Sequence, residues 1–217
     1  MKLIRNVRMI SPDVDYKYAN IIIDGETIKS IAEKEVNPDN FDDIIEGEGL
    51  MALPGFIDEH THGAVGFDTC DGKYESIVKI AEARLKEGVT MFLPTTLTMP
   101  HEVLVAAAKA VAQYRENERW AETPGLHIEG PFINCAYKGA QNPEYIRLPD
   151  TNEIKELNDI TPVKIVTVAP EVEGALQFIS DMREMGIVTS AGHSGATYAE
   201  FLAAKAAGLT HLTHFFN

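Results

Sequence analysis

The sequence has 217 residues, enough for one sizeable domain or two small ones, and 45% of them are hydrophobic, an ordinary fraction for a globular protein. Acidic residues number 33 against 19 basic ones, which gives a net charge of −14. Such a charge repels nucleic acid and anionic membranes, so we expect neither as a partner. An anionic substrate would need a local basic pocket.

The two cysteines, Cys70 and Cys135, stand far apart and match no C-x-x-C zinc or redox motif, so we predict that both are reduced thiols. No stretch approaches the ~20 apolar residues of a membrane span, and the first residues lack the apolar core of a signal peptide. The expected location is therefore the cytoplasm.

Residues 1–53 follow the pattern of short strands and predict a small β domain. Two apolar runs, 19–23 and 27–31, flank the pair Asp24-Gly25, which is a strong hairpin signal because glycine and aspartate tolerate the positive φ of tight turns. No residue pattern in this segment indicates a catalytic or binding site.

From residue 54 onward the pattern changes to strand, loop and helix, with glycine at the end of three of the helices. Gly88, Gly186 and Gly208 each precede β-branched or apolar residues that begin a strand. The predicted strands are 56–62, 91–95, 125–129, 164–169, 187–193 and 209–214, and the predicted helices are 74–87, 102–118, 152–158, 174–185 and 197–207. This alternation favours an α/β fold with a parallel sheet.

Six βα units are short of the eight that close a TIM-type (β/α)₈ barrel, which takes about 250 residues. We therefore predict that residues 54–217 form an incomplete barrel that stops after its sixth strand. The carboxyl ends of parallel barrel strands form one face, and polar residues on that face are candidates for the active site.

Five metal-ligating side chains fall at the ends of four predicted strands. His60 and His62 end the first strand, and residues two apart in a strand point to the same side. Glu129 ends the third strand, His193 the fifth and His214 the sixth. Imidazole nitrogen and carboxylate oxygen together suit zinc or a similar divalent transition metal. The cluster therefore predicts a metal site.

A single histidine in a strand is more often a hydrogen-bonded core residue than a ligand, so the prediction depends on the five residues jointly. His211 has the opposite parity to His214 and is expected to be structural, while His127 lies one layer deeper than Glu129. Phosphate-binding glycine motifs are absent. A serine nucleophile at Ser194 is a weak alternative, because its surroundings are not G-x-S-x-G.

Several segments resemble known enzymes. The segment 54–63, PGFIDEHTHG, is similar to the strand-one signature of the amidohydrolase superfamily. The segments 125–132, 192–194 and 213–217 (GLHIEGPF, GHS and THFFN) resemble the N-acetylglucosamine-6-phosphate deacetylase family in particular. This resemblance implies a barrel beside a small β-sandwich domain, to which residues 1–53 correspond and which C-terminal strands complete.

The resemblance also implies roles for individual residues. Glu129, His193 and His214 match the ligands of the principal metal, and His60 and His62 match positions that support a second one. The implied cofactor is one or two divalent transition metal ions, with zinc expected first and iron as an alternative. Ala140, Gln141 and Asn217 match substrate-binding positions, although many members have histidine where this chain has Gln141.

The implied reaction is metal-assisted hydrolysis of the acetamide of N-acetylglucosamine 6-phosphate, which gives glucosamine 6-phosphate and acetate. The family's proton-transfer aspartate and its phosphate-binding residues match no position up to Asn217, and some of the latter cross a dimer interface in the full-length homodimer. We therefore expect a truncated chain with little or no activity. The alternatives are an amidohydrolase for another acylated amine or cyclic amide, and a non-catalytic metal-binding remnant.

Overall fold

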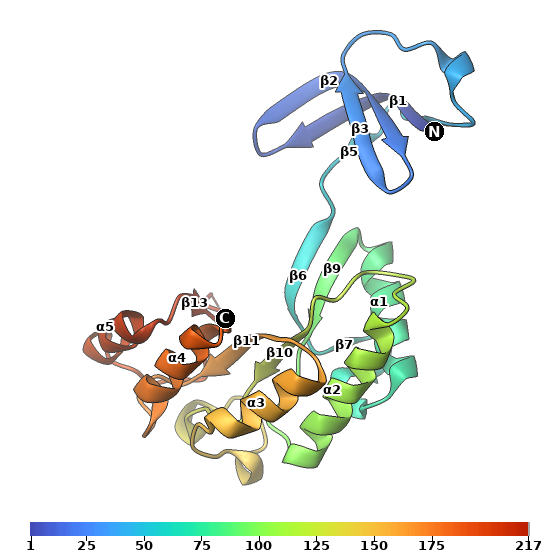
Figure 1. The fold of residues 1–217 in the computed structure, drawn as a ribbon. Coiled ribbons are helices and arrows are strands. Elements are labelled where there is room, and N and C mark those ends of the chain that lie inside the picture. Colours follow the sequence, from blue (N-terminus) through green and yellow to red (C-terminus); the bar gives the residue numbers. More distant parts are fainter. Residues whose placement is uncertain (217) are drawn as a thin grey trace. The chain divides into compact units, whose positions relative to one another are not determined.

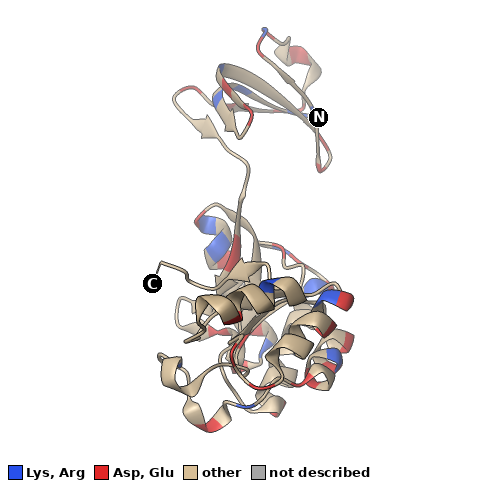
Figure 2. Cartoon of the chain, turned by 90° about the vertical axis from the view of Figure 1, so that its left-hand side faces the viewer, with Lys and Arg blue, Asp and Glu red and all other residues tan. Residues whose placement is uncertain are grey.

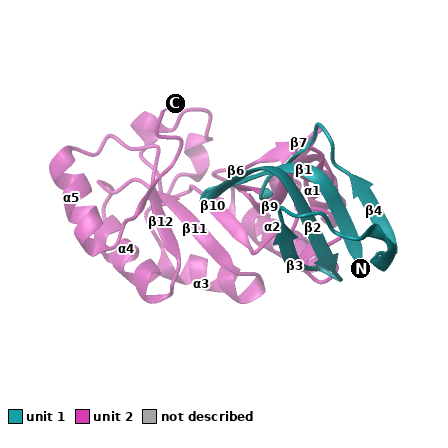
Figure 3. Ribbon diagram, turned by 90° about the horizontal axis from the view of Figure 1, so that it is seen from above, with its two compact units in different colours: residues 1–55 teal, residues 56–217 magenta. Residues whose placement is uncertain are grey.

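The computed structural model describes residues 1–216, and the chain divides into two compact units, Met1–Gly55 and Phe56–Asn217 (Figure 3). This division lies close to the predicted boundary between residues 53 and 54. Each unit encloses its own cluster of buried apolar side chains. Acidic and basic residues are spread over both units (Figure 2), so the net negative charge is not confined to one of them.

The first unit is a five-stranded mixed sheet. Its strands are β1 (Lys2–Ser11), β2 (Val14–Asp24), β3 (Thr27–Ala32), β4 (Asp43–Glu46) and β5 (Met51–Ala52), with the 3-10 helix η1 (Pro38–Asn40) before β4. The order is β3-β2-β1-β4, and β1 pairs antiparallel with β2 but parallel with β4 and β5. Val7, Ala19 and Ile21 form the small core. The sandwich implied by the resemblance stays a prediction.

The predicted hairpin forms between β2 and β3, but its turn lies one residue later than expected. Asp24 pairs with Thr27, so the two turn residues are Gly25 and Glu26. Gly25 has a φ of 60°, whereas Glu26 is not among the residues with positive φ. This pattern fits a type II′ turn, which needs glycine only at its first central position.

The second unit contains six parallel strands that follow one another in chain order (Figure 1). They are β6 (Phe56–Thr61), β9 (Val89–Pro94), β10 (Leu126–Glu129), β11 (Val163–Val168), β12 (Val188–Ala191) and β13 (His211–Leu212). β6 pairs with β9, and β10 to β13 form a second ladder. Isolated parallel bridges, including Thr95 with His127, connect the two ladders. A barrel closed by further strands stays a prediction.

Five α-helices alternate with these strands, one between each successive pair. They are α1 (Tyr74–Lys86), α2 (His101–Arg115), α3 (Thr151–Ile160), α4 (Ala175–Glu184) and α5 (Tyr198–Ala207). All five occupy predicted positions, with ends that differ by up to three residues. The sequence reasoning missed the short hairpin of β7 (Gly63–Ala64) and β8 (Phe67–Asp68). Among residues 1–216, no helix is long and apolar enough to cross a bilayer.

Two predicted strands are shorter than expected by more than one residue. β12 ends at Ala191, and β13 has only two residues, so His193 and His214 follow their strands rather than ending them. His193 has a φ of 51° and His214 a φ of 36°. Positive φ is uncommon in residues other than glycine and interrupts the extended backbone, which explains why both strands stop early.

Both cysteines are free thiols, as their spacing predicted. Cys70 lies beside the amide of Leu97, and burial raises the pKa of its thiol to about 12. Because the thiolate is the reactive form, Cys70 is chemically inert near neutral pH.

Candidate metal centre

Four strand ends bring one glutamate and four histidines together. His60 belongs to β6 and His62 follows that strand, so both side chains leave the backbone on the same side. Glu129 is the last residue of β10, and His193 and His214 lie two residues beyond β12 and β13. The structure thus assembles all five residues that were proposed as ligands from strand ends and strand parity.

The five side chains form two groups that share Glu129. One group contains His60 and His62, the other His193 and His214, and the candidate ligand atoms within each lie less than 4.8 Å apart. Oε1 of Glu129 lies 3.1 Å from Nε2 of His193 and 3.2 Å from Nε2 of His214. Oε2 lies 3.0 Å from Nε2 of His62. Oε1 therefore faces His193 and His214 and Oε2 faces His62, while Nε2 of His60 lies 3.6 Å from Oε1.

Glu129 is ionised in this setting although its side chain is only 2% exposed. Burial alone would raise the pKa of the carboxyl group. Hydrogen bonds with His193 and His62, and the charge of His60, outweigh burial and hold the pKa well below its usual range. A buried carboxylate surrounded by imidazoles is a ready partner for a cation.

Glu129 affects the pKa values of the surrounding histidines to different degrees. The hydrogen bond with Glu129 raises the pKa of His193. Burial lowers the pKa of His62, but the hydrogen bond and charge of Glu129 raise it by more. Burial dominates at His60 and lowers its pKa. Since a metal needs neutral imidazole, a raised pKa at His62 and His193 makes protons stronger competitors for an ion at these two residues.

Backbone carbonyls fix the orientation of two of the rings. Nδ1 of His62 lies 3.2 Å from the carbonyl oxygen of Thr95, and Nδ1 of His193 lies 3.0 Å from that of Tyr137. A carbonyl only accepts hydrogen bonds, so each Nδ1 donates its proton to the carbonyl, and Nε2 is the nitrogen that faces Glu129 and would bind an ion. Metal-bound histidines are usually oriented in this way, so these residues fit a zinc-type ion.

A buried polar layer lies one step deeper than the candidate ligands. His127 is 3% exposed and contacts the carbonyl of Glu59 through Nδ1 and the hydroxyl of Thr167 through Nε2, both at 2.8 Å. Burial lowers the pKa of His127 to about 4, so the ring is neutral. The Thr167 hydroxyl also hydrogen-bonds the Thr213 hydroxyl at 2.8 Å, and the Thr213 hydroxyl hydrogen-bonds that of Ser190 at 2.7 Å. This chain of side chains crosses from β10 to the end of β13.

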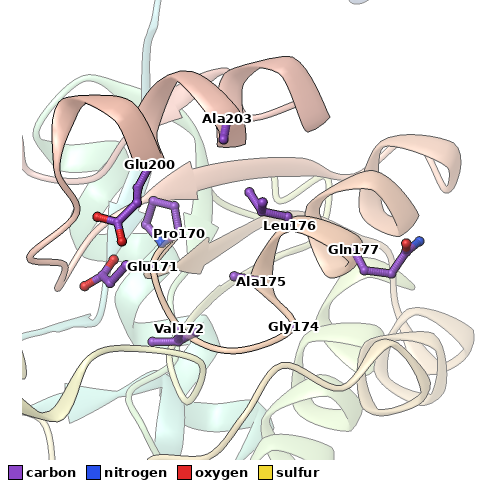
Figure 4. Close-up of a pocket in the computed structure, with 9 residues that line it drawn as sticks. All are labelled: Pro170, Glu171, Val172, Gly174, Ala175, Leu176, Gln177, Glu200 and Ala203. Carbon is purple, nitrogen blue, oxygen red and sulfur yellow. The ribbon is translucent and has the colours of Figure 1, made fainter.

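Glu171, just after β11, holds the turn that follows His193. Its carboxylate accepts hydrogen bonds from the Ser194 hydroxyl at 2.6 Å, the Gly195 amide at 2.6 Å and the Asn134 side chain at 2.8 Å. The backbone N–H of Asn134 donates to the backbone carbonyl of His193. Burial would raise the pKa of Glu171, but these bonds lower it. The same glutamate lines a cavity of about 290 Å³ beside α4 and α5 (Figure 4).

The three predicted substrate-binding residues have different surroundings. Ala140 is exposed on the loop after β10, whereas Gln141 is buried. The Gln141 side chain donates to Oε2 of Glu129 at 2.9 Å and accepts from the amide of Thr98 at 2.6 Å. Asn217 lies outside the described residues. The substrate role of all three stays a prediction.

A cavity of about 420 Å³ opens beside His193 and His214, with Tyr137, Phe201 and Phe215 among its lining residues. Cavities of a few hundred cubic ångströms with an apolar lining and a few polar groups are typical of small-molecule sites. His211 is exposed, hydrogen-bonds Thr210 and belongs to neither group of candidate ligands.

Sequence reasoning missed part of this neighbourhood. The hydroxyls of Thr167, Ser190 and Thr213 were not anticipated, because threonine and serine in strands are common and most have no special role. The signal that could have found them is that alternate residues of a strand point inward, on the same strands that lead to the candidate ligands. Glu171 was not anticipated either, since no local pattern shows that it reaches the turn after His193.

Comparison with known proteins identifies the family. Residues 51–217 match the amidohydrolase family. This chain belongs to that family. Within it, the chain is 33% identical to an N-acetylglucosamine-6-phosphate deacetylase of Lysinibacillus sphaericus over 99% of this chain and 56% of the relative.

Other amidohydrolases extend the comparison. An N-acetylgalactosamine-6-phosphate deacetylase of Escherichia coli O157:H7 is 34% identical over 80% of this chain and 47% of the relative. The crystal structure of N-acetylglucosamine-6-phosphate deacetylase from Pasteurella multocida superimposes with a TM-score of 0.92 at 30% identity, covering 100% of this chain and 57% of that one. The chain thus spans about half the length of the curated relatives it matches.

Proposed function

We propose that this chain carries the metal centre of a deacetylase that hydrolyses the acetamide of N-acetylglucosamine 6-phosphate to glucosamine 6-phosphate and acetate. The observation that carries the proposal is the Glu129 carboxylate shared between two histidine pairs. The names of the relatives supply the substrate class. The match to an N-acetylgalactosamine-6-phosphate deacetylase makes the galacto sugar the second candidate substrate.

In this proposal Glu129, His193 and His214 hold the principal ion, and His60 and His62 hold a second one. Zinc is the expected ion, with iron as the alternative, because the donors are imidazole nitrogens and a carboxylate. When bound, such an ion supplies an acidified water and a Lewis acid for the acetamide carbonyl.

The chain's own residues prepare this site before any ion arrives. Glu129 brings a buried negative charge, and the carbonyls of Thr95 and Tyr137 orient the rings of His62 and His193. The cavity beside His193 is the proposed place for the acetamide end of the substrate. Phe201 and Phe215 form part of its wall.

We also propose that the 217 residues bind metal with little or no turnover. The support is the resemblance, in which a proton-transfer aspartate and a phosphate pocket complete the reaction and match no position in this sequence. By the same resemblance, the proposed full-length form is a homodimer that acts on a small-molecule substrate.

Zinc content measured after equilibrium dialysis tests the metal centre. We expect the parent chain to bind one or two ions per molecule and His193→Gln to lose at least one of them. His211→Gln is the matched control, because His211 lies outside both groups of candidate ligands, and it should bind as the parent does. Full zinc stoichiometry in His193→Gln would contradict the assignment.

The zinc-loaded chain is then assayed for acetate release from N-acetylglucosamine 6-phosphate and from its galacto isomer. We expect acetate release at or near background with both sugars. Turnover with one isomer alone would identify the substrate, and it would refute the view that further residues are needed.

A further inference from the structure

Gln141 is held at both ends of its side chain. The residue is only 5% exposed, its Nε2 donates to Oε2 of Glu129 at 2.9 Å, and its Oε1 accepts from the amide of Thr98 at 2.6 Å. The partners fix the orientation of the amide group. The Thr98 amide can only donate and the Glu129 carboxylate can only accept, so the carbonyl end must face Thr98 and the nitrogen must face Glu129.

Thr98 is itself fixed by the segment that follows Glu129. Gly130 has a φ of 71°, and a Cβ at this position would lie 2.0 Å from Oγ1 of Thr98. Only glycine therefore allows the backbone after Glu129 to pack directly on Thr98. Thr98, Gly130 and the Gln141 side chain together form a rigid support on one side of the carboxylate.

The carboxylate of a glutamate needs such support to keep one orientation. Rotation about its terminal torsion has only a broad, roughly two-fold preference. In this structure Oε2 faces His62 and Gln141, while Oε1 faces His193 and His214. Among these partners Gln141 differs from the histidines, because as an amide it holds Oε2 without being a candidate metal ligand.

We propose that Gln141 is a positioning residue that fixes the plane of the Glu129 carboxylate, so that Oε2 is presented to His62 and Oε1 to His193 and His214. This inference rests on the proposed metal centre. It also separates two roles for Gln141, because a residue that only touched the substrate would not affect metal binding in the absence of substrate.

Cobalt binding to the full chain, followed by titration against a competing chelator and by visible absorption, tests the proposal without any substrate. Gln141→Met removes both hydrogen bonds at nearly constant volume. We expect its cobalt affinity to fall about 10- to 100-fold, the usual effect of losing a group that orients a metal ligand. We also expect the ligand-field bands of bound cobalt to shift, because the carboxylate changes its orientation.

Gln177→Met is the matched control. Gln177 is exposed on α4 and donates to a carboxylate of Asp181 at 2.8 Å, so the same chemical change is made away from the centre. Its cobalt affinity and spectrum should equal those of the parent. If Gln177→Met lost as much cobalt affinity as Gln141→Met, the proposal would be overturned, because the loss in affinity would then not depend on the contact between Gln141 and Glu129.

Gln141→Asn serves if the methionine variant does not fold. It retains the amide, but its side chain is one methylene too short to span Thr98 and Glu129 together, so we expect weaker cobalt binding here as well. Affinity within about twofold of the parent in a folded variant overturns the role of Gln141. A parent chain that takes up no cobalt instead refutes the proposed function itself.

Discussion

Glu171 accepts three hydrogen bonds from the turn after His193 and from Asn134, whose amide also binds the carbonyl of His193. One carboxylate thus joins the loop after β10 to the turn after β12. Because His193 has a φ of 51°, its backbone depends on such contacts to keep its position. The stability of this turn should therefore depend on the charge of Glu171.

Replacing Glu171 with glutamine keeps the shape but turns one acceptor into a donor that faces other donors. Urea unfolding of Glu171→Gln should show a loss of about 1–3 kcal/mol in the free energy of unfolding, as for hydrogen bonds to charged groups. Glu173→Gln, the same change at an exposed position in the same loop, should stay within about 0.5 kcal/mol of the parent. Equal effects in the two variants would argue against a special role for Glu171.

At the scale of residues, strand ends and strand parity were sufficient to propose the five candidate ligands, because the carboxyl ends of parallel strands meet on one face and alternate side chains point to one side. It could not reveal that His193 and His214 follow their strands with positive φ, since nothing local to either histidine requires that conformation. It also could not reveal the contacts of Gln141 or Thr167, which depend on loops and strands far apart in the sequence.

At the scale of elements, an ionic cluster links α2 to α3. His101 begins α2, and its ring contacts Glu153 and Glu156 of α3, both at 3.1 Å. Arg147 also pairs with Glu153 and donates to the carbonyl of Met99. Burial lowers the pKa of His101, but hydrogen bonds with the two glutamates raise it by more.

The raised pKa gives this link a definite pH dependence. The stabilisation is fully present below the ordinary histidine pKa of about 6.5 and is lost as the pH rises through the folded-state value. His101→Gln should therefore be less stable than the parent near about pH 5.5, and the difference should shrink near about pH 8.5. The effect should stay within about 1 kcal/mol, because the His101 side chain is 39% exposed.

Urea unfolding of both proteins at the two pH values measures this difference. His211→Gln is the control, because it replaces an exposed histidine without carboxylate contacts in the described structure. Its difference from the parent in the free energy of unfolding should not shrink between the two pH values. A His101→Gln difference that is constant or grows with pH would show that His101 does not act as a charged link.

All five helices were predicted, whereas the strands β7 and β8 were missed and β13 was overestimated, for a physical reason. Periodic apolar residues and the glycines at helix ends specify a helix locally, and the Thr197 capping box shows such a local signal in α5. A strand depends on its neighbours for hydrogen bonds. β13 pairs only with β12 among the described strands and is two residues long, where the sequence alone suggested six.

At the scale of the whole molecule, the two units differ in how much apolar surface they bury. The first has a buried core of three residues, whereas the core of the second includes side chains from all five helices. The sequence pattern changes from short strands to βα repetition near residue 54, and the two compact units divide between residues 55 and 56. A unit of 55 residues with so small a core is expected to be marginally stable by itself.

Zinc should therefore stabilise only part of the chain. Trp120 is the single tryptophan and lies in the second unit, so its fluorescence reports on the unit with the candidate ligands, whereas far-UV circular dichroism reports on both. At free zinc about 100 times its Kd, the fluorescence transition should gain about 2.7 kcal/mol, and a chelator should reverse the gain. The unfolding transition of residues 1–55, seen by circular dichroism, should stay at the same denaturant concentration with and without zinc. A zinc effect that persists in His193→Gln at full size, or that shifts both transitions equally, would contradict a metal centre confined to the second unit.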